Sequence, residues 1–429
     1  MLESTDKVAI IGGGLGGMAA ALALHELKIK CSVYEMRDTH AAPPTSSGAL
    51  MLSPNMLRIV ERFGLVPEIQ KKSFPFEYVY YKDADEQTID RYPLGDEAAF
   101  GYKAQRIYRQ DLLNILYEAC FARNVPIHFG KKFAGVIEET GSSVTFKFAD
   151  GSTETASLLI GSDGIHSKVR EYICPGVPKK YLGLSALTWE TPTKQLRVPE
   201  DKDYKFPVSV LTSNGAFVLA PQRPDGSAML AGTQFPVAED LVVDRQKWNE
   251  FMADKSALVE RAKQNIDVWP DIAKSSIEDI NVETMNVWPF FSIPRLFSWT
   301  SASQQRVVIL GDAAHAIPPT TGNGASQAFE DAFTLSLILS ALRGNKELKW
   351  ENALRFWQDM RQDRIDELMI LTRQLNNKRL PLEKQKLLPE NELWFDESAD
   401  NPRQMAWLYD PKLEETVDAW VKEAKRGRG

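Results

Sequence analysis

The sequence predicts an α/β fold with three parts: a Rossmann-like nucleotide-binding domain, an antiparallel-sheet substrate domain inserted into it, and a helical C-terminal region. A short apolar run, a glycine-rich turn, a helical stretch and a second apolar run open the chain, which is the order of a Rossmann unit. Short strand patterns separated by turn residues follow between residues 181 and 286. Beyond Ala332 the pattern favours helices up to about Asn376.

The first motif places a glycine-rich turn between a strand and a helix. Val8–Ile11 is a short apolar run that predicts a buried strand, and Ala19–Leu27 predicts the helix. The spacing G-x-G-x-x-G falls on Gly12, Gly14 and Gly17. A second strand over Cys31–Tyr34 delivers Glu35 at the separation expected of an acid that binds a ribose hydroxyl. The motif therefore predicts a dinucleotide site, and its residues leave open whether the dinucleotide is NAD or FAD.

The stretch from Val307 to Ala332 carries a second motif, around which the rest of the chain is organised. Val307–Leu310 predicts a strand covered on both faces, which Gly311 and Asp312 break abruptly. Asp312 then lies beyond the carboxyl end of the strand, where its carboxylate can accept hydrogen bonds from sugar or polyol hydroxyls. The loop and helix start that follow hold further candidates: Pro318, Pro319, Gly322, Asn323, Gly324 and Ala325. A helix N-terminus there favours an anion, whereas an ordinary strand–loop–helix connection explains the glycines alone.

Three more residues are candidates for cofactor contacts, and each has a plain structural alternative. Asp163 follows the apolar run Leu158–Ile160 in an Asp-Gly turn, where it either meets a polar ligand or only forms the turn. Arg109 opens an amphipathic helix and is either a phosphate ligand or a solvated arginine. Gly48 either lets the chain approach a cofactor closely or is an ordinary loop glycine.

Strands of another sheet are expected to interrupt the nucleotide-binding domain twice. The predicted divisions are 1–75, 101–180 and 287–376 for the nucleotide-binding domain, 76–100 and 181–286 for the substrate domain, and 377–429 for a C-terminal extension. Phe76–Tyr81 and Thr88–Tyr92 predict a hairpin, and Arg245–Lys263 predicts one helix.

Composition favours small molecules as partners. The chain is 43% hydrophobic and 25% charged, and its net charge of −7 argues against a nucleic-acid or anionic-membrane surface. Cys31, Cys120 and Cys174 are widely spaced and match no metal-ligand spacing, so we expect neither a disulfide nor a bound metal. No stretch has the length and apolar character of a transmembrane segment, and we expect a cytoplasmic protein.

Together the motifs resemble the FAD-dependent aromatic hydroxylases, the single-component (class A) flavoprotein monooxygenases. GGGLGG with Glu35, IGSDGIHSKVR and GDAAHAIPPTTGNGASQAFEDA follow one another in the family's order. The resemblance implies that Gly12, Gly14, Gly17 and Glu35 hold the ADP half of FAD, that Arg109 and Asp163 contact the cofactor, that Asp312 holds the ribityl chain, and that Gly322, Asn323, Gly324 and Ala325 lie against the isoalloxazine. Arg37 is a further candidate for cofactor binding, although Met36 separates it from Glu35 and the family usually places this arginine directly after the acid. Thr320-Thr321 replace a small or glycine-rich pair.

The resemblance also implies a reaction. In this family NAD(P)H reduces the flavin, O2 adds at its C4a carbon, and one oxygen atom passes to an electron-rich, usually aromatic, substrate by hydroxylation or epoxidation. NADPH or NADH would visit transiently, because no second glycine motif follows a strand. The alternatives are a flavin oxidase or dehydrogenase, a halogenase of the same fold, and a non-enzymatic escort protein; the Trp-x-Trp-x-Ile-Pro segment of the halogenases is missing.

The five histidines leave the expected substrate sheet without one, since none lies between His166 and His315. Histidine is the usual base near neutral pH. Tyr181 and Tyr204 are the phenols of that sheet and, with Pro318 and Pro319, are candidate pocket residues. We therefore expect a substrate that needs no enzyme base, and a pH profile of kcat/KM without a limb near about 6.5. Such a limb, lost in one His→Gln variant, would contradict this.

Overall fold

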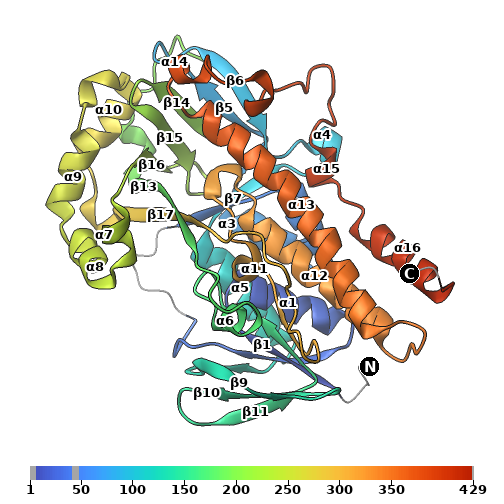
Figure 1. Cartoon of the computed structure of the whole chain (residues 1–429). Helices are drawn as coiled ribbons and strands as arrows, with labels where there is room; N and C mark the ends of the chain where they lie inside the picture. The colour runs from blue at the N-terminus through green and yellow to red at the C-terminus, as the bar shows by residue number, and fades with distance from the viewer. Residues whose placement is uncertain (1–5, 41–47, 428–429) are drawn as a thin grey trace.

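The computed structural model describes residues 6–40 and 48–427 (Figure 1). Its nucleotide-binding part is organised around a five-stranded parallel sheet with the strand order β18-β12-β1-β2-β8. These strands are β1 (Lys7–Ile11), β2 (Lys30–Tyr34), β8 (Ile127–His128), β12 (Leu158–Gly161) and β18 (Val307–Ile309). Segments that are far apart in the sequence therefore meet in one sheet.

The parallel sheet is covered on both faces, as its continuous apolar strands predict. Helices α1 (Leu15–Glu26), α5 (Arg109–Ala122) and α12 (Gly324–Leu342) lie on one face (Figure 1). The antiparallel strands β9 (Phe133–Glu139), β10 (Val144–Phe148) and β11 (Thr153–Ala156) lie on the other. There the Tyr34 ring contacts the rings of Phe146 and Phe148. The predicted buried strands over Val8–Ile11 and Val307–Leu310 are confirmed.

A small sheet joins the two halves of the molecule. Its strand order is β3-β7-β4, with β3 (Ala49–Leu52), β7 (Ala104–Tyr108) and β4 (Phe74–Phe76). Leu52 and Ile107 pack into the core of the nucleotide-binding part. Ala104 and Phe76 point the other way and pack in a second cluster with Leu211. One face of the small sheet thus packs against the nucleotide-binding half and the other against the second half. In the sequence, the helices between its strands are α2 (Pro54–Arg62), α3 (Val66–Lys72) and α4 (Glu97–Phe100).

The second half is a seven-stranded sheet in the order β17-β13-β16-β15-β14-β5-β6. Its strands are β5 (Tyr78–Lys82), β6 (Thr88–Pro93), β13 (Lys180–Pro192), β14 (Val208–Thr212), β15 (Gly215–Pro221), β16 (Ala228–Phe235) and β17 (Asn286–Ser292). Helices α7 (Glu239–Val243), α8 (Arg245–Ala253), α9 (Lys255–Lys263) and α10 (Asp271–Glu278) gather along it (Figure 1). Trp189 and Phe217 pack against α9 and α10, whereas the alternate residues Thr188, Val218 and Leu230 stay half-buried on the inner face.

One long helix links the halves. α13 (Trp350–Lys378) has 29 residues and is roughly 43 Å long at 1.5 Å per residue. Trp357 near its start is buried in the nucleotide-binding core, and Leu371 packs in the cluster with Leu211 of β14. The chain ends with α14 (Leu382–Gln385), α15 (Ala406–Tyr409) and α16 (Leu413–Lys425). Across the described ranges, every helix is too short or too polar to span a bilayer.

Two predicted elements are wrong in detail. The single helix expected over Arg245–Lys263 is two helices, because the Asp254 side chain accepts a hydrogen bond from the Ala257 N–H and begins α9 there. The strand expected over Phe76–Tyr81 is split between β4 and β5, which belong to different sheets. The predicted pairing of β5 with β6, and of both with the substrate sheet, is confirmed.

Candidate cofactor site

The three motif glycines of the first turn have different roles: two are needed for the fold, and one leaves space for a ligand. Gly12 has a φ of +105°, and a Cβ on Gly17 would lie 1.9 Å from the Gly12 carbonyl oxygen, so both serve the fold. A Cβ on Gly14 would meet no atom of the described chain within 4 Å. Gly14 precedes α1, which has no side-chain cap. The first N–H groups of α1 thus have no side-chain acceptor and follow a glycine with open space beside it, which suits a phosphate.

Glu35 is fixed beside this turn. It is 5% exposed at the end of β2, and its Oε2 accepts a hydrogen bond from the Gly13 N–H at 2.7 Å. Its Oε1 accepts from the Arg37 Nε at 3.0 Å. Arg37 therefore reaches the acid despite the intervening Met36. The Arg37 backbone N–H also donates to Oε1, so Oε2 is the oxygen that keeps a further lone pair. The ribose contact expected of Glu35 stays a prediction.

The Gly-Asp turn is held in place by hydrogen bonds to a buried acid of α12. After β18, α11 (Asp312–His315) and the 3₁₀ turn η4 (Pro319–Thr321) lead to α12. The buried carboxylate of Asp331 accepts a hydrogen bond from the Gly311 N–H at 2.9 Å and lies 2.6 Å from the His315 Nε2. The Asp312 side chain is accessible to solvent, and no described residue forms a hydrogen bond with it.

Arg109 interacts electrostatically with an acid of each motif. Like Asp312, its side chain is accessible although protein atoms surround it on most sides. Burial lowers the pKa of Arg109, as does Arg37, while the carboxylates of Asp312 and Glu35 oppose this change. Burial raises the pKa of Asp312, and His315 and Arg109 oppose the rise. The Arg109 backbone N–H donates to the Gly48 carbonyl at 2.9 Å.

The N-terminus of α12 resembles that of α1. It has no side-chain cap, and a Cβ on Gly324 would meet nothing within 4 Å. Gly322 has a φ of +67°, which turns the chain into the helix. Asn323 is fully buried; its Nδ2 donates to the Thr321 carbonyl and its Oδ1 accepts from Ser53. The two helix starts lie side by side, since a Cβ on Gly16 would be 3.4 Å from the Cβ of Ala328.

The Asp-Gly motif is hydrogen-bonded to the Gly-Asp turn through Arg170. Asp163 Oδ2 accepts hydrogen bonds from the backbone N–H groups of Lys168 and Val169, at 2.7 and 3.2 Å, at the start of α6 (Lys168–Ile173). Its Oδ1 is buried and has no partner in the described chain. Arg170 donates to the carbonyls of Ala313 and Ile165, at 3.0 and 2.7 Å, and so ties the two motifs together. Asp163 thus holds its turn, and its contact with a cofactor stays a prediction.

A buried ionic network under the site was missed by sequence reasoning. Glu330, Asp331 and Arg361 are fully buried, and Arg361 forms ion pairs with both acids. Arg364 adds a 2.7 Å ion pair to Glu330, which also accepts a hydrogen bond from Asn55. The available signal in the sequence is two adjacent acids inside the otherwise uncharged α12, with two arginines three residues apart on α13.

The pocket candidates are dispersed. Pro318 is buried and Pro319 exposed in the Gly-Asp loop. Tyr181 packs on Phe291, with its hydroxyl 3.1 Å from Ser185 Oγ. Tyr204 donates to Glu86 at 2.7 Å, and burial, reinforced by Glu86, raises its pKa far above the usual value. Among the described residues, no hydrogen bond or ring contact joins either tyrosine to the Gly-Asp loop. The Trp288 ring, by contrast, lies against Gly48, where a Cβ would be 3.3 Å away.

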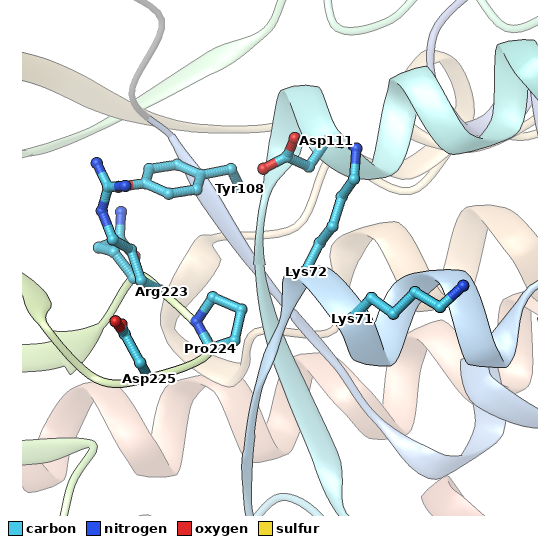
Figure 2. Close-up of a pocket in the computed structure, with 8 residues that line it drawn as sticks. Lys71, Lys72, Tyr108, Asp111, Arg223, Pro224 and Asp225 are labelled. Carbon is cyan, nitrogen blue, oxygen red and sulfur yellow. Dashed lines mark ion pairs between the residues drawn. The ribbon is translucent and has the colours of Figure 1, made fainter.

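A separate hollow of about 460 Å³ opens beside β7 (Figure 2). Its lining residues are Lys71, Lys72, Tyr108, Asp111, Gln222, Arg223, Pro224 and Asp225. None of these is among the predicted cofactor residues. The hollow is therefore distinct from the edge where the two helix N-termini meet.

The residues present fit FAD. Two adjacent, uncapped helix starts with open glycines can receive the diphosphate and the anionic side of the flavin ring. The accessible Asp312 carboxylate suits polyol hydroxyls, and Arg109, which interacts electrostatically with Asp312 and Glu35, supplies a cation for a phosphate. Among the sequence candidates, the structure gathers those of the first motif, Gly48, Arg109, Asp312 and the α12 start at one edge of the parallel sheet.

Known proteins are similar along most of the chain. The family model described as FAD binding domain matches residues 5–350. A 6-hydroxynicotinate 3-monooxygenase from Bordetella bronchiseptica is 27% identical over 344 residues, which cover 79% of this chain and 83% of the relative. A 3-amino-4-hydroxybenzoate 2-monooxygenase from Streptomyces platensis is 26% identical over 425 residues, 95% and 96% of the two chains.

The solved structure of CtdE in complex with FAD and substrate 4 has the same fold. Its TM-score is 0.76 at 18% identity, and the match covers 98% of this chain and 99% of that one. The family match spans the whole cofactor edge, and the glycines, acid and helix starts of that edge fit FAD. This chain therefore belongs to the FAD-dependent aromatic hydroxylases, a family of flavoprotein monooxygenases with an FAD-binding domain.

Proposed function

We propose that this protein uses FAD, NAD(P)H and O2 to insert one oxygen atom into a small, electron-rich aromatic molecule. The observation that carries the proposal is the pair of adjacent, uncapped helix starts, α1 and α12, together with the accessible Asp312 and an Arg109 that interacts electrostatically with Asp312 and Glu35. A nicotinamide dehydrogenase needs only the first of these, and an escort protein has no need of the Asp312 region. FAD, when bound, supplies the redox chemistry by accepting hydride from NAD(P)H and activating O2.

The protein's own residues bind and orient. We assign the N–H groups after Gly14 to the diphosphate, Glu35 to the ribose and Asp312 to the ribityl hydroxyls. The start of α12, from Gly322 to Ala325, would stabilise negative charge on the ring. Arg109 would hold a phosphate, and Arg37, Gly48 and Asp163 would keep the surrounding turns in place.

We assign the substrate to the space between this edge and the inner face of the seven-stranded sheet. Gly232 lies between Thr188 and Val218 on that face, so a side chain is missing at its centre. The named relatives act on hydroxynicotinate and aminohydroxybenzoate, which supports an aromatic substrate. The predicted division into nucleotide-binding and substrate domains is part of the proposal, with β17 extending the substrate sheet to Ser292.

The proposal includes a cytoplasmic location. Cys31, Cys120 and Cys174 are all free thiols, as a reducing compartment favours.

The test begins with purification. The protein should be yellow, with FAD that is released on denaturation, and it should consume NAD(P)H in an O2-dependent way that a true substrate accelerates. Mass analysis of products from phenols, indoles and aromatic acids should then find one added oxygen atom. A colourless protein that takes up no flavin would contradict the proposal. Anaerobic substrate turnover at the aerobic rate would identify a dehydrogenase instead.

A further inference from the structure

Arg106 is a buried cation without a counter-ion in the described chain. It is 4% exposed in β7, and its one hydrogen bond runs from Nε to the Oε1 of Gln222 at 3.0 Å. The buried arginines of the described residues are Arg106, Arg170, Arg306 and Arg361. Arg361 pairs with two acids, and Arg170 and Arg306 donate terminal N–H groups to backbone carbonyls. Arg106 alone among the four leaves both terminal nitrogens without an acceptor.

The charge on Arg106 persists at neutral pH. Burial lowers the pKa of Arg106 to about 10, and no nearby carboxylate opposes the change. A guanidinium removed from water without a partner is unfavourable, and a bound anion would relieve this. The neighbouring Gln222 Nε2 is also buried without a partner among the described residues. The site therefore presents only donors, which an ionised carboxylate matches because it only accepts.

The place of Arg106 in the small sheet sets where such an anion would lie. Met51 and Phe74 are its direct partners on β3 and β4, so all three side chains share one face. Met51 lies against Gly322 of the Gly-Asp loop, at 3.2 Å from a Cβ built there. Phe74 lies 3.5 Å from a Cβ built on Gly226, in the turn after β15. Arg106 thus lies between the loop assigned to the flavin and the substrate sheet.

We infer that Arg106, together with Gln222, binds an anionic group of the aromatic substrate, a carboxylate being the best match. The guanidinium can offer two parallel N–H donors to one carboxylate, which fixes orientation as well as charge. The inference rests on the proposed function, since it places the substrate beside the flavin. It makes Arg106 a specificity-determining residue that selects aromatic acids over their neutral analogues.

The neighbouring hollow supplies a matched control. Figure 2 shows Arg223 reaching toward Tyr108 there, and Arg223 lies 3.8 Å from the Glu190 carboxylate. Lys72 lies 3.7 Å from Asp111, and Lys71 pairs with Glu68 at 2.6 Å. Each positively charged side chain that lines the hollow thus forms an ion pair with a carboxylate. Arg223 is also half exposed, so replacing it removes a nearby positive charge without touching the buried donors.

The experiment uses the FAD-loaded protein and acid–amide pairs: salicylate with salicylamide, and 4-hydroxybenzoate with 4-hydroxybenzamide. Binding is measured from the change in flavin absorbance, which requires no turnover. The wild type should bind the acid of at least one pair more tightly, and Arg106→Gln should weaken that acid by about 10- to 100-fold while the amide changes little. Arg106→Lys should recover part of the loss, and Arg223→Gln should keep the wild-type ratio.

A second measurement needs no ligand. Arg106→Met removes an unpaired charge, so the thermal midpoint of the substrate-free holoprotein should stay the same or rise. A fall of several degrees would make Arg106 a structural residue and overturn the inference. So would equal binding of acid and amide by the wild type in every pair, or loss of FAD from Arg106→Gln. Arg106-dependent binding of acids without any stimulation of NAD(P)H oxidation would instead count against the proposed reaction.

Discussion

Among single residues, Gly17 is needed for folding, whereas Gly14, in the same turn, is assigned to cofactor binding. An alanine at Gly17 would place its Cβ 1.9 Å from the Gly12 carbonyl oxygen, whereas at Gly14 it would meet no atom of the described chain. The φ of Gly14 is −76°, which any residue adopts. Gly14→Ala should therefore keep the stability of the apoprotein and lose FAD affinity, while Gly17→Ala should lower stability itself. Urea denaturation of the apoproteins and FAD titration separate the two effects. A Gly14→Ala protein with wild-type FAD affinity would contradict the assigned diphosphate position.

Asp312 permits a second test at this scale. Its carboxylate is accessible and free of hydrogen bonds from described residues, so its removal should leave the fold intact. Each charged hydrogen bond to a ligand contributes roughly 1.5–3 kcal/mol, and Asp312→Ala should thus weaken FAD binding by about 10- to 100-fold. Asp85→Ala, an exposed aspartate in the β5–β6 turn, should have no effect. Unchanged FAD affinity in Asp312→Ala would show that the Gly-Asp turn is misassigned.

At the scale of elements, α12 and α13 are joined by the ion pairs of Arg361 with Glu330 and Asp331. Replacing the arginine with methionine would leave two buried acids without their main partner. We expect Arg361→Met to lower the free energy of unfolding by about 3–5 kcal/mol, and to weaken FAD binding because Asp331 holds the Gly311 N–H. Arg373→Met, which breaks the exposed pair with Glu392, should change stability by about 0–1 kcal/mol. Equal effects of the two substitutions on the free energy of unfolding, measured by chemical denaturation, would show that the buried network contributes no more to stability than an exposed ion pair.

Elements whose signal is local could be predicted from the sequence, and those set by distant partners could not. The apolar runs of β1, β2 and β18 and the glycines after β1 carry their own explanation, so that half of the site was found. β7 was missed because Gln105 and Arg106 break its apolar pattern, and their hydrogen-bond partners Ser73 and Gln222 lie outside the strand. Glu330 and Asp331 were missed for the same reason, since the arginine that neutralises them lies on another helix.

At the scale of the whole molecule, the same network should make stability sensitive to acid. Burial alone would raise the pKa of Asp331, but His315 and Arg361 outweigh it and hold the pKa at about 2. An unfolded aspartate has a pKa of about 3.9, so the folded state binds fewer protons and loses stability as the pH falls from 4 to 2. The loss from this one group is roughly 2–3 kcal/mol. Urea denaturation at several pH values should find a shallower acid loss in Asp331→Asn than in the wild type, with the exposed Asp85→Asn as the unchanged control. Parallel pH curves for wild type and Asp331→Asn would count against this account.

The side-by-side packing of α1 and α12 has a consequence for synthesis on the ribosome. α1 is complete at residue 26, whereas α12 begins at residue 324. At typical translation rates of about 5–20 residues per second, the apolar surface of α1 waits for its neighbour for roughly 15–60 s. During that interval the nascent chain carries an uncovered helix whose central residues, from Met18 to Leu24, are all apolar. Chaperones that shield such surfaces should therefore engage the first part of this chain long before the cofactor edge can close.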